Sequence, residues 1–154
     1  MGTFEVLNTL LVKLFNDILD IEEKALITEE FRDISVTDMH IIEHIGIGEP
    51  KTMSTISKSL GVTMGTLTIG INGLVKKGYV ERNRSEKDRR IVYASLTRKG
   101  FAAFKHHMNF HKAMINSVME DLSEEEAAIL TKTFVRLEDF FGQWTHNANN
   151  DDSE

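Results

Sequence analysis

The sequence has no cysteine and only one proline, Pro50, in 154 residues. The absence of cysteine excludes disulfides, thiolate metal ligands and cysteine nucleophiles, and it leads us to expect a cytoplasmic protein. No apolar run reaches the roughly 18 residues that a membrane span needs, so neither a signal sequence nor a membrane segment is predicted. The near absence of proline, together with abundant Leu, Ile, Met, Glu and Lys, favours helices.

Positive charge is scarce overall, since the net charge is −6, but it is concentrated in one part of the chain. Residues 51–105 hold 12 of the 18 Lys and Arg but only 3 of the 24 Asp and Glu, a balance of +9. The remainder carries a balance of −15. Such asymmetry indicates a module that binds a polyanion within an otherwise acidic protein. A solvated surface with chance clustering is the alternative.

Apolar residues recur every three or four positions near both ends of the chain, which predicts long amphipathic helices. The first stripe comprises Leu7, Leu10, Leu11, Leu14, Phe15, Ile18 and Leu19. Two more follow Thr97 and a capping box at Ser123 and Glu126, and they comprise Phe101, Phe104, Met108, His111, Ile115, Val118 and Leu122, then Ala127, Leu130, Phe134, Leu137, Phe141 and Trp144. These stripes need partners, either within one chain or in a two-fold dimer.

The sequence pattern in the middle of the chain predicts short helices and strands. Helices are expected at 35–46, 52–61 and 63–78, and the last two form a helix-turn-helix. β-Branched and aromatic residues then predict a hairpin with a basic tip, SEKDRR. We therefore expect a mainly α fold with a small β-hairpin wing: a DNA-binding lobe at 35–97, dimerisation helices at 1–34 and 98–146, and a disordered tail at 147–154.

The helix at 63–78 has two different faces. Leu67, Ile71, Leu74 and Val75 form the core face with Met64 beside them, whereas the opposite face carries Gly65, Ile69, Asn72 and Lys76, with Thr66 and Thr68 at its edges and Thr63 as N-cap. Short hydroxyl, amide and methyl groups suit base edges in a major groove. Gly65 would let the helix N-terminus approach a phosphate. A helix packed on both faces is the alternative.

The hairpin tip concentrates basic side chains beside this helix. Arg84, Lys87 and Arg89 are predicted to meet DNA phosphates and the minor groove, and arginine suits the narrow groove of A·T-rich DNA. Asp88 is predicted to orient Arg90 through a charge-assisted hydrogen bond. The alternative is an ion pair within the hairpin that serves no ligand.

Residues from about Ser35 to Gly100, and above all the run DRRIVYASLTRKG, resemble the MarR family of winged helix-turn-helix repressors. The resemblance implies a homodimer that binds a pseudo-palindromic operator in double-stranded DNA. It makes Arg90 the minor-groove residue and Asp88 its partner. It places Thr63, Gly65, Thr66 and Thr68 in the part of the recognition helix that contacts bases and phosphates.

A narrower resemblance rests on LFNDILDIEEKAL, FRDISVTDMHIIEHIG, GTLTIGIN and RSEKDRRIVY. These segments are similar to MarR-type repressors of fatty-acid-synthesis genes in Gram-positive bacteria. The similarity implies that long-chain acyl groups on acyl carrier protein act as corepressor. The expected acyl pocket is lined by Phe15, Leu19, Phe101, Phe104 and Met108, although each of these could simply be a core residue.

The histidines raise an alternative, a zinc-responsive regulator of the same family. His107 and His111 have the i, i+4 spacing of a chelating pair, and His40, His44 and His106 could join them. Against this, His111 belongs to an apolar stripe and no cysteine ligand exists. We therefore predict no bound cofactor. No catalytic arrangement of residues is visible either, so an enzyme is not expected.

Overall fold

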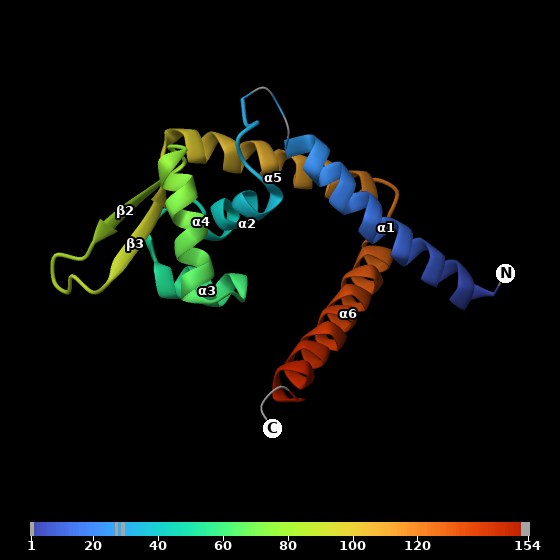
Figure 1. The fold of residues 1–154 in the computed structure, drawn as a ribbon. Helices are drawn as coiled ribbons and strands as arrows, with labels where there is room; N and C mark the ends of the chain where they lie inside the picture. The colour runs from blue at the N-terminus through green and yellow to red at the C-terminus, as the bar shows by residue number, and fades with distance from the viewer. Residues whose placement is uncertain (1, 27, 29, 152–154) are drawn as a thin grey trace. The chain divides into compact units, whose positions relative to one another are not determined.

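The computed structural model describes residues 2–26, 28 and 30–151, and it divides after Phe110 into two compact units. The elements of the first unit are α1 (Thr3–Leu26), α2 (Val36–Ile45), β1 (Lys51–Thr52), α3 (Met53–Leu60), α4 (Met64–Lys76), β2 (Val80–Arg84), β3 (Val92–Leu96) and the first part of α5 (Arg98–Met119) (Figure 1). The second unit contains the rest of α5 and α6 (Glu124–Asp151). None of the described helices is long and apolar enough to cross a membrane.

The predicted caps define where the short helices begin and end. At the start of α2 the Ser35 hydroxyl accepts a hydrogen bond from the Asp38 amide at 3.1 Å, and the Asp38 carboxylate accepts one from the Ser35 amide at 3.1 Å. Thr52 caps α3 in the same way, since its hydroxyl accepts from the Thr55 amide. Gly61 ends α3 with a φ of +69°, a left-handed conformation that glycine adopts without strain. The capping predictions for this region are confirmed.

The apolar core of the first unit forms where α2, α3, α4, the sheet and the start of α5 meet. Its buried side chains include Met39, Ile42, Ile45, Ile56, Leu67, Ile71, Leu74, Tyr79 and Val80. Phe31 and Ile34 at one end, and Ala103 on α5 at the other, belong to the same core. We call residues 31–103 the winged-helix lobe. It extends beyond 35 and 97, the limits predicted for the DNA-binding lobe, because Phe31 and Ile34 from the segment before α2 and Ala103 from α5 are buried in the same core.

A small antiparallel sheet forms the wing, with the strand order β1-β3-β2. β2 pairs with β3 from Val80 opposite Leu96 to Arg84 opposite Val92, and the hairpin projects away from α4 (Figure 1). The sequence did not predict β1, in which Lys51 pairs with Ala94 on the other edge of β3. A strand of two residues leaves no periodic pattern, because its pairing to a distant strand defines it.

A close contact joins the end of the wing to α5. The Thr97 amide donates to the Tyr79 carbonyl at 3.0 Å, and the Thr97 hydroxyl donates to the Gly78 carbonyl at 2.6 Å. The same hydroxyl accepts from the Gly100 amide, so Thr97 caps α5. A methyl group on Gly100 would overlap the Tyr79 carbonyl. The Leu-Thr-x-x-Gly part of the sequence motif therefore has a structural basis in this contact.

Tyr79 also ties the segment before α2 to the rest of the lobe. Its hydroxyl donates to Asp33 at 2.6 Å, and the Lys99 ammonium lies 4.2 Å from the centre of its ring. Burial raises the pKa of Tyr79 far above its usual value, and the hydrogen bond to Asp33 adds to this rise. The hydrogen bond from Tyr79 holds the pKa of Asp33 below its usual value. Tyr79 is thus a neutral donor and Asp33 a charged acceptor.

The long terminal helices keep their apolar stripes exposed. On α1 the exposed apolar residues include Leu7, Leu10, Leu11, Leu14, Phe15 and Leu19, and on α6 they include Ile129, Phe134, Val135, Phe140, Phe141 and Trp144. α6 continues to Asp151, so residues 147–151, which were predicted to be disordered, are helical. No proline or glycine interrupts the backbone hydrogen bonds after Gly142. Residues 152–154 of the predicted tail lie outside the described residues.

Candidate nucleic-acid interface

The N-terminus of α4 is exposed and built from two threonines and a glycine. The Thr63 hydroxyl accepts from the Thr66 amide at 3.2 Å and donates to the Thr66 hydroxyl at 3.0 Å. Gly65 is exposed, and a methyl group there would approach no atom closer than 4.0 Å. The first turn of α4 therefore presents backbone amides that an anion can approach closely.

The two predicted faces of α4 are present. Leu67, Ile71 and Leu74 are buried in the lobe, whereas Ile69 is 76% exposed. Gly65, Asn72, Lys76 and Thr66 are also exposed, and Thr68 is half-buried. Met64, which was predicted to lie beside the core face, is instead 47% exposed. It occupies the first residue of the helix, where the lobe core has ended.

Two polar side chains on the exposed face of α4 already have partners. The Thr68 hydroxyl donates to the Met64 carbonyl one turn earlier at 2.7 Å. The Asn72 side-chain oxygen accepts a hydrogen bond from an Arg82 Nη at 2.6 Å, which ties α4 to β2. The side-chain amide nitrogen of Asn72 carries two N–H donors besides. Sequence reasoning missed Arg82 because its link to Asn72 depends on β2 lying beside α4 in the folded chain.

At the wing tip the Asp88 carboxylate binds Arg90 through three donors. Its Oδ1 accepts from the Arg90 amide at 3.0 Å and from Arg90 Nε at 3.1 Å, and its Oδ2 accepts from Nη2 at 3.1 Å. These hydrogen bonds hold the pKa of Asp88 below its usual value. The Arg90 side chain is 91% exposed. The predicted contact between Asp88 and Arg90 is therefore present, while its role in DNA binding stays a prediction.

Ser85 closes the tip, and sequence reasoning did not single it out. Its hydroxyl accepts from the amides of Lys87 and Asp88, each at 3.3 Å. The Ser85 amide donates to the Ile91 carbonyl at 2.9 Å, and the Ile91 amide donates to the Asp88 carbonyl at 3.0 Å. Arg84, Lys87 and Arg89 are exposed around this turn. The tip is thus an ordered basic turn.

A hollow of about 470 Å³ separates α4 from the wing. Its lining comes from the start of α3, from α4 and from β2 and β3, and includes Met64, Thr68, Arg82, Arg90, Ile91 and Val92. Arginines thus line an open space next to the exposed face of α4. None of the five residues predicted to line an acyl pocket lines this hollow.

The predicted acyl-pocket residues lie on α1 and on the first part of α5. Phe15, Leu19, Phe101 and Met108 are 41–59% exposed. Phe104 is partly buried and packs against the lobe core. Phe104 thus packs as a core residue, and the acyl-binding role of all five residues stays a prediction.

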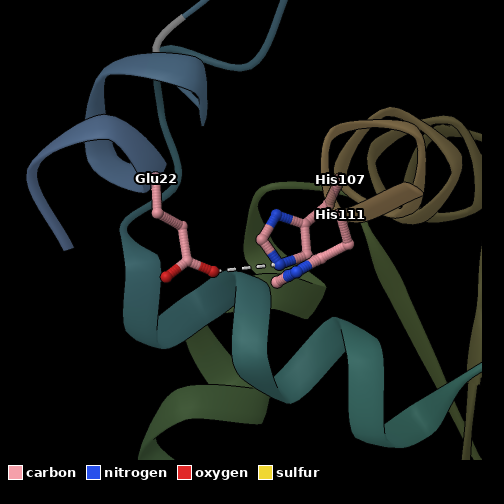
Figure 2. Close-up of side chains that lie close together, drawn as sticks. All are labelled: Glu22, His107 and His111. Atoms are coloured by element: carbon pink, nitrogen blue, oxygen red, sulfur yellow. Dashed lines mark ion pairs between the residues drawn. The ribbon is translucent and has the colours of Figure 1, made fainter. Parts of the chain in front are cut away.

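The five histidines whose side chains the structure describes fall into two groups. His40 and His107 each approach the carboxylate of Glu22, and Figure 2 shows the ion pair between Glu22 and His107 with His111 alongside. By contrast, His44 Nδ1 lies 2.8 Å from the His40 carbonyl, and His106 Nε2 lies 2.9 Å from the Ala25 carbonyl. Of the predicted candidates, His40 and His107 each approach Glu22, and His111 lies within 4.8 Å of Glu22 and His107. His44 and His106 contact backbone instead. Sequence reasoning missed Glu22.

Comparisons with known proteins agree on one family. A profile described as MarR family matches residues 32–91. The transcriptional repressor YetL of Bacillus subtilis is 29% identical over 119 residues, which are 65% of this chain and 71% of that protein. The transcriptional regulator SarZ of Staphylococcus saprophyticus is 32% identical over 101 residues, 66% of this chain and 68% of its own length.

Among solved structures, Streptococcus pneumoniae FabT in complex with DNA superposes with a TM-score of 0.83. The two chains are 42% identical, and the match covers 92% of this chain and 99% of that chain. The likeness therefore extends through the helices on both sides of the winged-helix lobe.

Proposed function

The chain belongs to the MarR family of transcriptional regulators, and from this premise we propose that it is a repressor that binds a pseudo-palindromic DNA operator as a homodimer. One observation carries the proposal: an exposed helix face of short side chains lies beside an ordered basic wing whose arginine is already oriented. The 42% identity to a protein solved in complex with DNA supports it.

In this proposal α4 enters the major groove. Its N-terminal amides, with Thr63, Gly65 and Thr66, meet a phosphate, because the positive end of a helix favours an anion. Thr68 and Asn72 meet base edges, and Ile69 meets a thymine methyl group, since apolar contact with that methyl is a common means of readout. Lys76, at the other end of α4, contacts the sugar-phosphate backbone of the DNA.

The wing contacts the adjacent minor groove. Arg90 projects from the tip, and the narrow minor groove of A·T-rich DNA attracts such a guanidinium. Arg84, Lys87 and Arg89 contact phosphates around the tip and supply the salt-dependent part of the affinity. The DNA strand between the two grooves would cross the hollow between α4 and the wing, where Arg82 faces it.

The exposed apolar stripes of α1 and α6 support the homodimer. Monomeric proteins rarely expose continuous apolar patches of more than a few hundred Å². A two-fold dimer would cover these stripes and present two copies of α4 to half-sites one helical turn apart, about 34–36 Å. The acidic character of the chain outside residues 51–105 would keep DNA contacts confined to the lobe.

The finer part of the proposal concerns the effector. The similarity to repressors of fatty-acid-synthesis genes, together with the identity to FabT, supports regulation of those genes with long-chain acyl-acyl carrier protein as corepressor. Phe15, Leu19, Phe101 and Met108 expose apolar surface for an acyl chain, and methionine adapts well to flexible ligands. The ligand acts only if it binds the DNA-competent conformation better than the other.

Fluorescence anisotropy with promoter DNA, including that of fatty-acid-synthesis genes, tests both parts. We expect salt-sensitive binding that acyl-acyl carrier protein tightens by roughly 5–150-fold. Each added methylene should contribute up to about 0.8 kcal/mol until the pocket is full, and carrier protein without an acyl group should have little effect. Absence of binding at low salt, with or without effector, would refute the repressor. A DNA affinity that does not depend on acyl length would refute the proposed effector but not the proposed repressor.

A further inference from the structure

A hydrogen bond between two exposed side chains joins the outer face of α4 to the wing. An Nη atom of Arg82, on β2, lies 2.6 Å from the side-chain oxygen of Asn72, on α4. Because its donor is charged, this hydrogen bond belongs to the stronger kind. It lies on the surface that the repressor proposal turns towards DNA, so it bears on how that surface reads bases.

The strand register explains why Arg82 reaches α4. Residues two apart on a strand point to the same face of the sheet, and Val80 is buried in the lobe core. Arg82 therefore points to the same side as Val80, and β2 lies against α4. Arg84 shares this side, but it lies nearer the tip, and its Nη1 atom is 3.5 Å from the Arg89 carbonyl oxygen. Two arginines on one strand thus have different partners, which makes Arg84 a natural control for Arg82.

The bond determines which way the Asn72 amide faces. A guanidinium group only donates hydrogen bonds, so it can bond the oxygen of an amide side chain but not its nitrogen. The oxygen of Asn72 is therefore held towards Arg82, and the nitrogen with its two N–H donors points away from Arg82. Without Arg82 the amide could turn over, because its oxygen and nitrogen have nearly the same size and shape. Arg82 thus gives the exposed end of Asn72 the character of a donor.

The major-groove edges of the four bases differ in what such a donor can meet. Guanine O6 and thymine O4 accept hydrogen bonds, whereas the amino groups at adenine N6 and cytosine N4 donate them. Asparagine can pair with adenine through two hydrogen bonds, in which its oxygen accepts from N6 and its nitrogen donates to N7. In this protein the oxygen needed for that pair is bonded to a cation, whose charge disfavours a second donor at the same atom.

We propose that Arg82 is a positioning residue for base recognition: it keeps Asn72 a donor, so that Asn72 selects guanine or thymine over adenine or cytosine. The inference rests on the proposed function, because it requires α4 to lie in the major groove. It deepens that function by naming the class of base that one residue of α4 reads in each half-site. A phosphate contact is the other role open to the exposed charge of Arg82, and such a contact carries no sequence information.

The experiment begins with duplexes that the full-length wild-type protein selects from a random pool. The selection is repeated with Asn72→Ala, and the base pair whose preference is lost is the one that Asn72 reads. Four duplexes that differ only at this pair, in both half-sites, are then compared by fluorescence anisotropy. For the wild type, the duplexes with guanine or thymine on the same strand should bind roughly tenfold more tightly than the other two, within the range of a good contact between side chain and base.

Arg82→Ala should remove this preference. The freed amide can turn its oxygen outwards and accept from the amino groups of adenine or cytosine, so the four affinities should agree to within about twofold. In the Asn72→Ala protein, adding Arg82→Ala should change no base preference, because the amide that Arg82 positions is absent. A phosphate contact would instead weaken binding to all four duplexes alike in both backgrounds.

Arg84→Ala is the matched control, because it removes the same charge from the same side of β2 without touching Asn72. It should lower the affinity for all four duplexes alike and keep the wild-type preference. Both arginines are exposed, so the Tm of each variant should stay close to that of the wild type. A changed preference in Arg82→Ala then reports on recognition and not on folding.

Three results would overturn this inference and leave the repressor proposal standing. The wild-type preference kept in Arg82→Ala would make Arg82 a phosphate contact only. A wild-type preference for adenine alone at the identified pair would show that Asn72 reads with its oxygen. An Asn72→Ala protein that selects the same duplexes as the wild type would show that Asn72 reads no base. If the wild type selects no duplex at all, the repressor proposal fails, and this inference fails with it.

Discussion

The winged-helix lobe and the long terminal helices bury their apolar residues in opposite ways. The lobe encloses a core of fully buried side chains within one chain, from Phe31 to Ala103. In α1 and α6, none of the described apolar side chains is buried, and Phe4, Phe134 and Trp144 are more than half-exposed. The difference indicates that one chain suffices to fold the lobe, whereas the stripes of α1 and α6 need a partner to cover them.

The largest effect is expected in the lobe core. Ile71→Ala should lower the free energy of unfolding by about 2–5 kcal/mol, because it removes buried methyl groups and leaves a cavity. Ile69→Ala, two residues earlier on the exposed face of α4, should change it by less than about 0.5 kcal/mol. Urea denaturation followed by circular dichroism measures both. Equal losses would show that α4 is packed on both faces.

The next effect concerns the stripe on α1. Leu14→Glu should weaken self-association by roughly 100-fold or more, because each buried leucine contributes about 1.5–3 kcal/mol and the dimer contains two copies. Lys13→Glu, the neighbouring exposed position, should leave association nearly unchanged. Sedimentation equilibrium compares them. A Leu14→Glu protein that associates as well as the wild type would remove α1 from the dimer interface.

Alanine substitutions at two glycines should distinguish an effect on folding from an effect on DNA binding. Gly100→Ala should destabilise the lobe by about 1–3 kcal/mol, because its methyl group meets the Tyr79 carbonyl. The methyl group of Gly65→Ala would approach no atom of the chain closer than 4.0 Å, so the Tm of this variant should stay close to that of the wild type. Gly65→Ala should nevertheless weaken operator binding if a phosphate sits against the first turn of α4. Unchanged operator affinity would place the phosphate elsewhere.

Substitutions at the wing should affect DNA binding without affecting stability. Arg90→Ala should lower operator affinity by roughly tenfold or more, corresponding to about 1–3 kcal/mol, and by more than Arg82→Ala. Asp88→Ala should also weaken binding, although it removes a negative charge from the tip. Simple electrostatics predicts the opposite sign, so tighter binding by Asp88→Ala in an anisotropy titration would refute the orienting role.

The smallest effect is expected for single phosphate contacts. Lys87→Ala should weaken binding to all DNA sequences alike and reduce the slope of log affinity against log salt by about 1. Lys132→Ala, on α6 outside the lobe, should leave the slope unchanged. A salt series of anisotropy titrations measures both slopes, and a normal slope for Lys87→Ala would show that this lysine does not neutralise a phosphate.

Sequence reasoning was most accurate for contacts that form within a short segment of the chain. Ser35, Thr52, Thr63 and Ser123 cap helices as expected, because each cap needs only a side chain and an amide three residues later. The contact between Asp88 and Arg90 was predictable for the same reason, since it lies within one turn.

What the sequence did not predict depends on distant segments. β1 exists because Lys51 pairs with Ala94, and the amide of Asn72 is engaged because Arg82 reaches it. Glu22 meets His107 across 85 positions of sequence. One local signal for Glu22 was present: this carboxylate follows Phe15 and Ile18 in the apolar register of α1, where a charged residue is out of place.

The bond between Asp88 and Arg90 also determines which part of the guanidinium is left for a ligand. An arginine side chain has five N–H donors, and Asp88 takes the Nε donor and one on Nη2. Three donors stay available, all at the end of the side chain farthest from its backbone. The arginine therefore contacts acceptors with the far end of its guanidinium group. This orientation suits a narrow groove. These hydrogen bonds restrict its rotamers, so part of the roughly 2 kcal/mol of entropy of a free arginine is already lost before a ligand arrives.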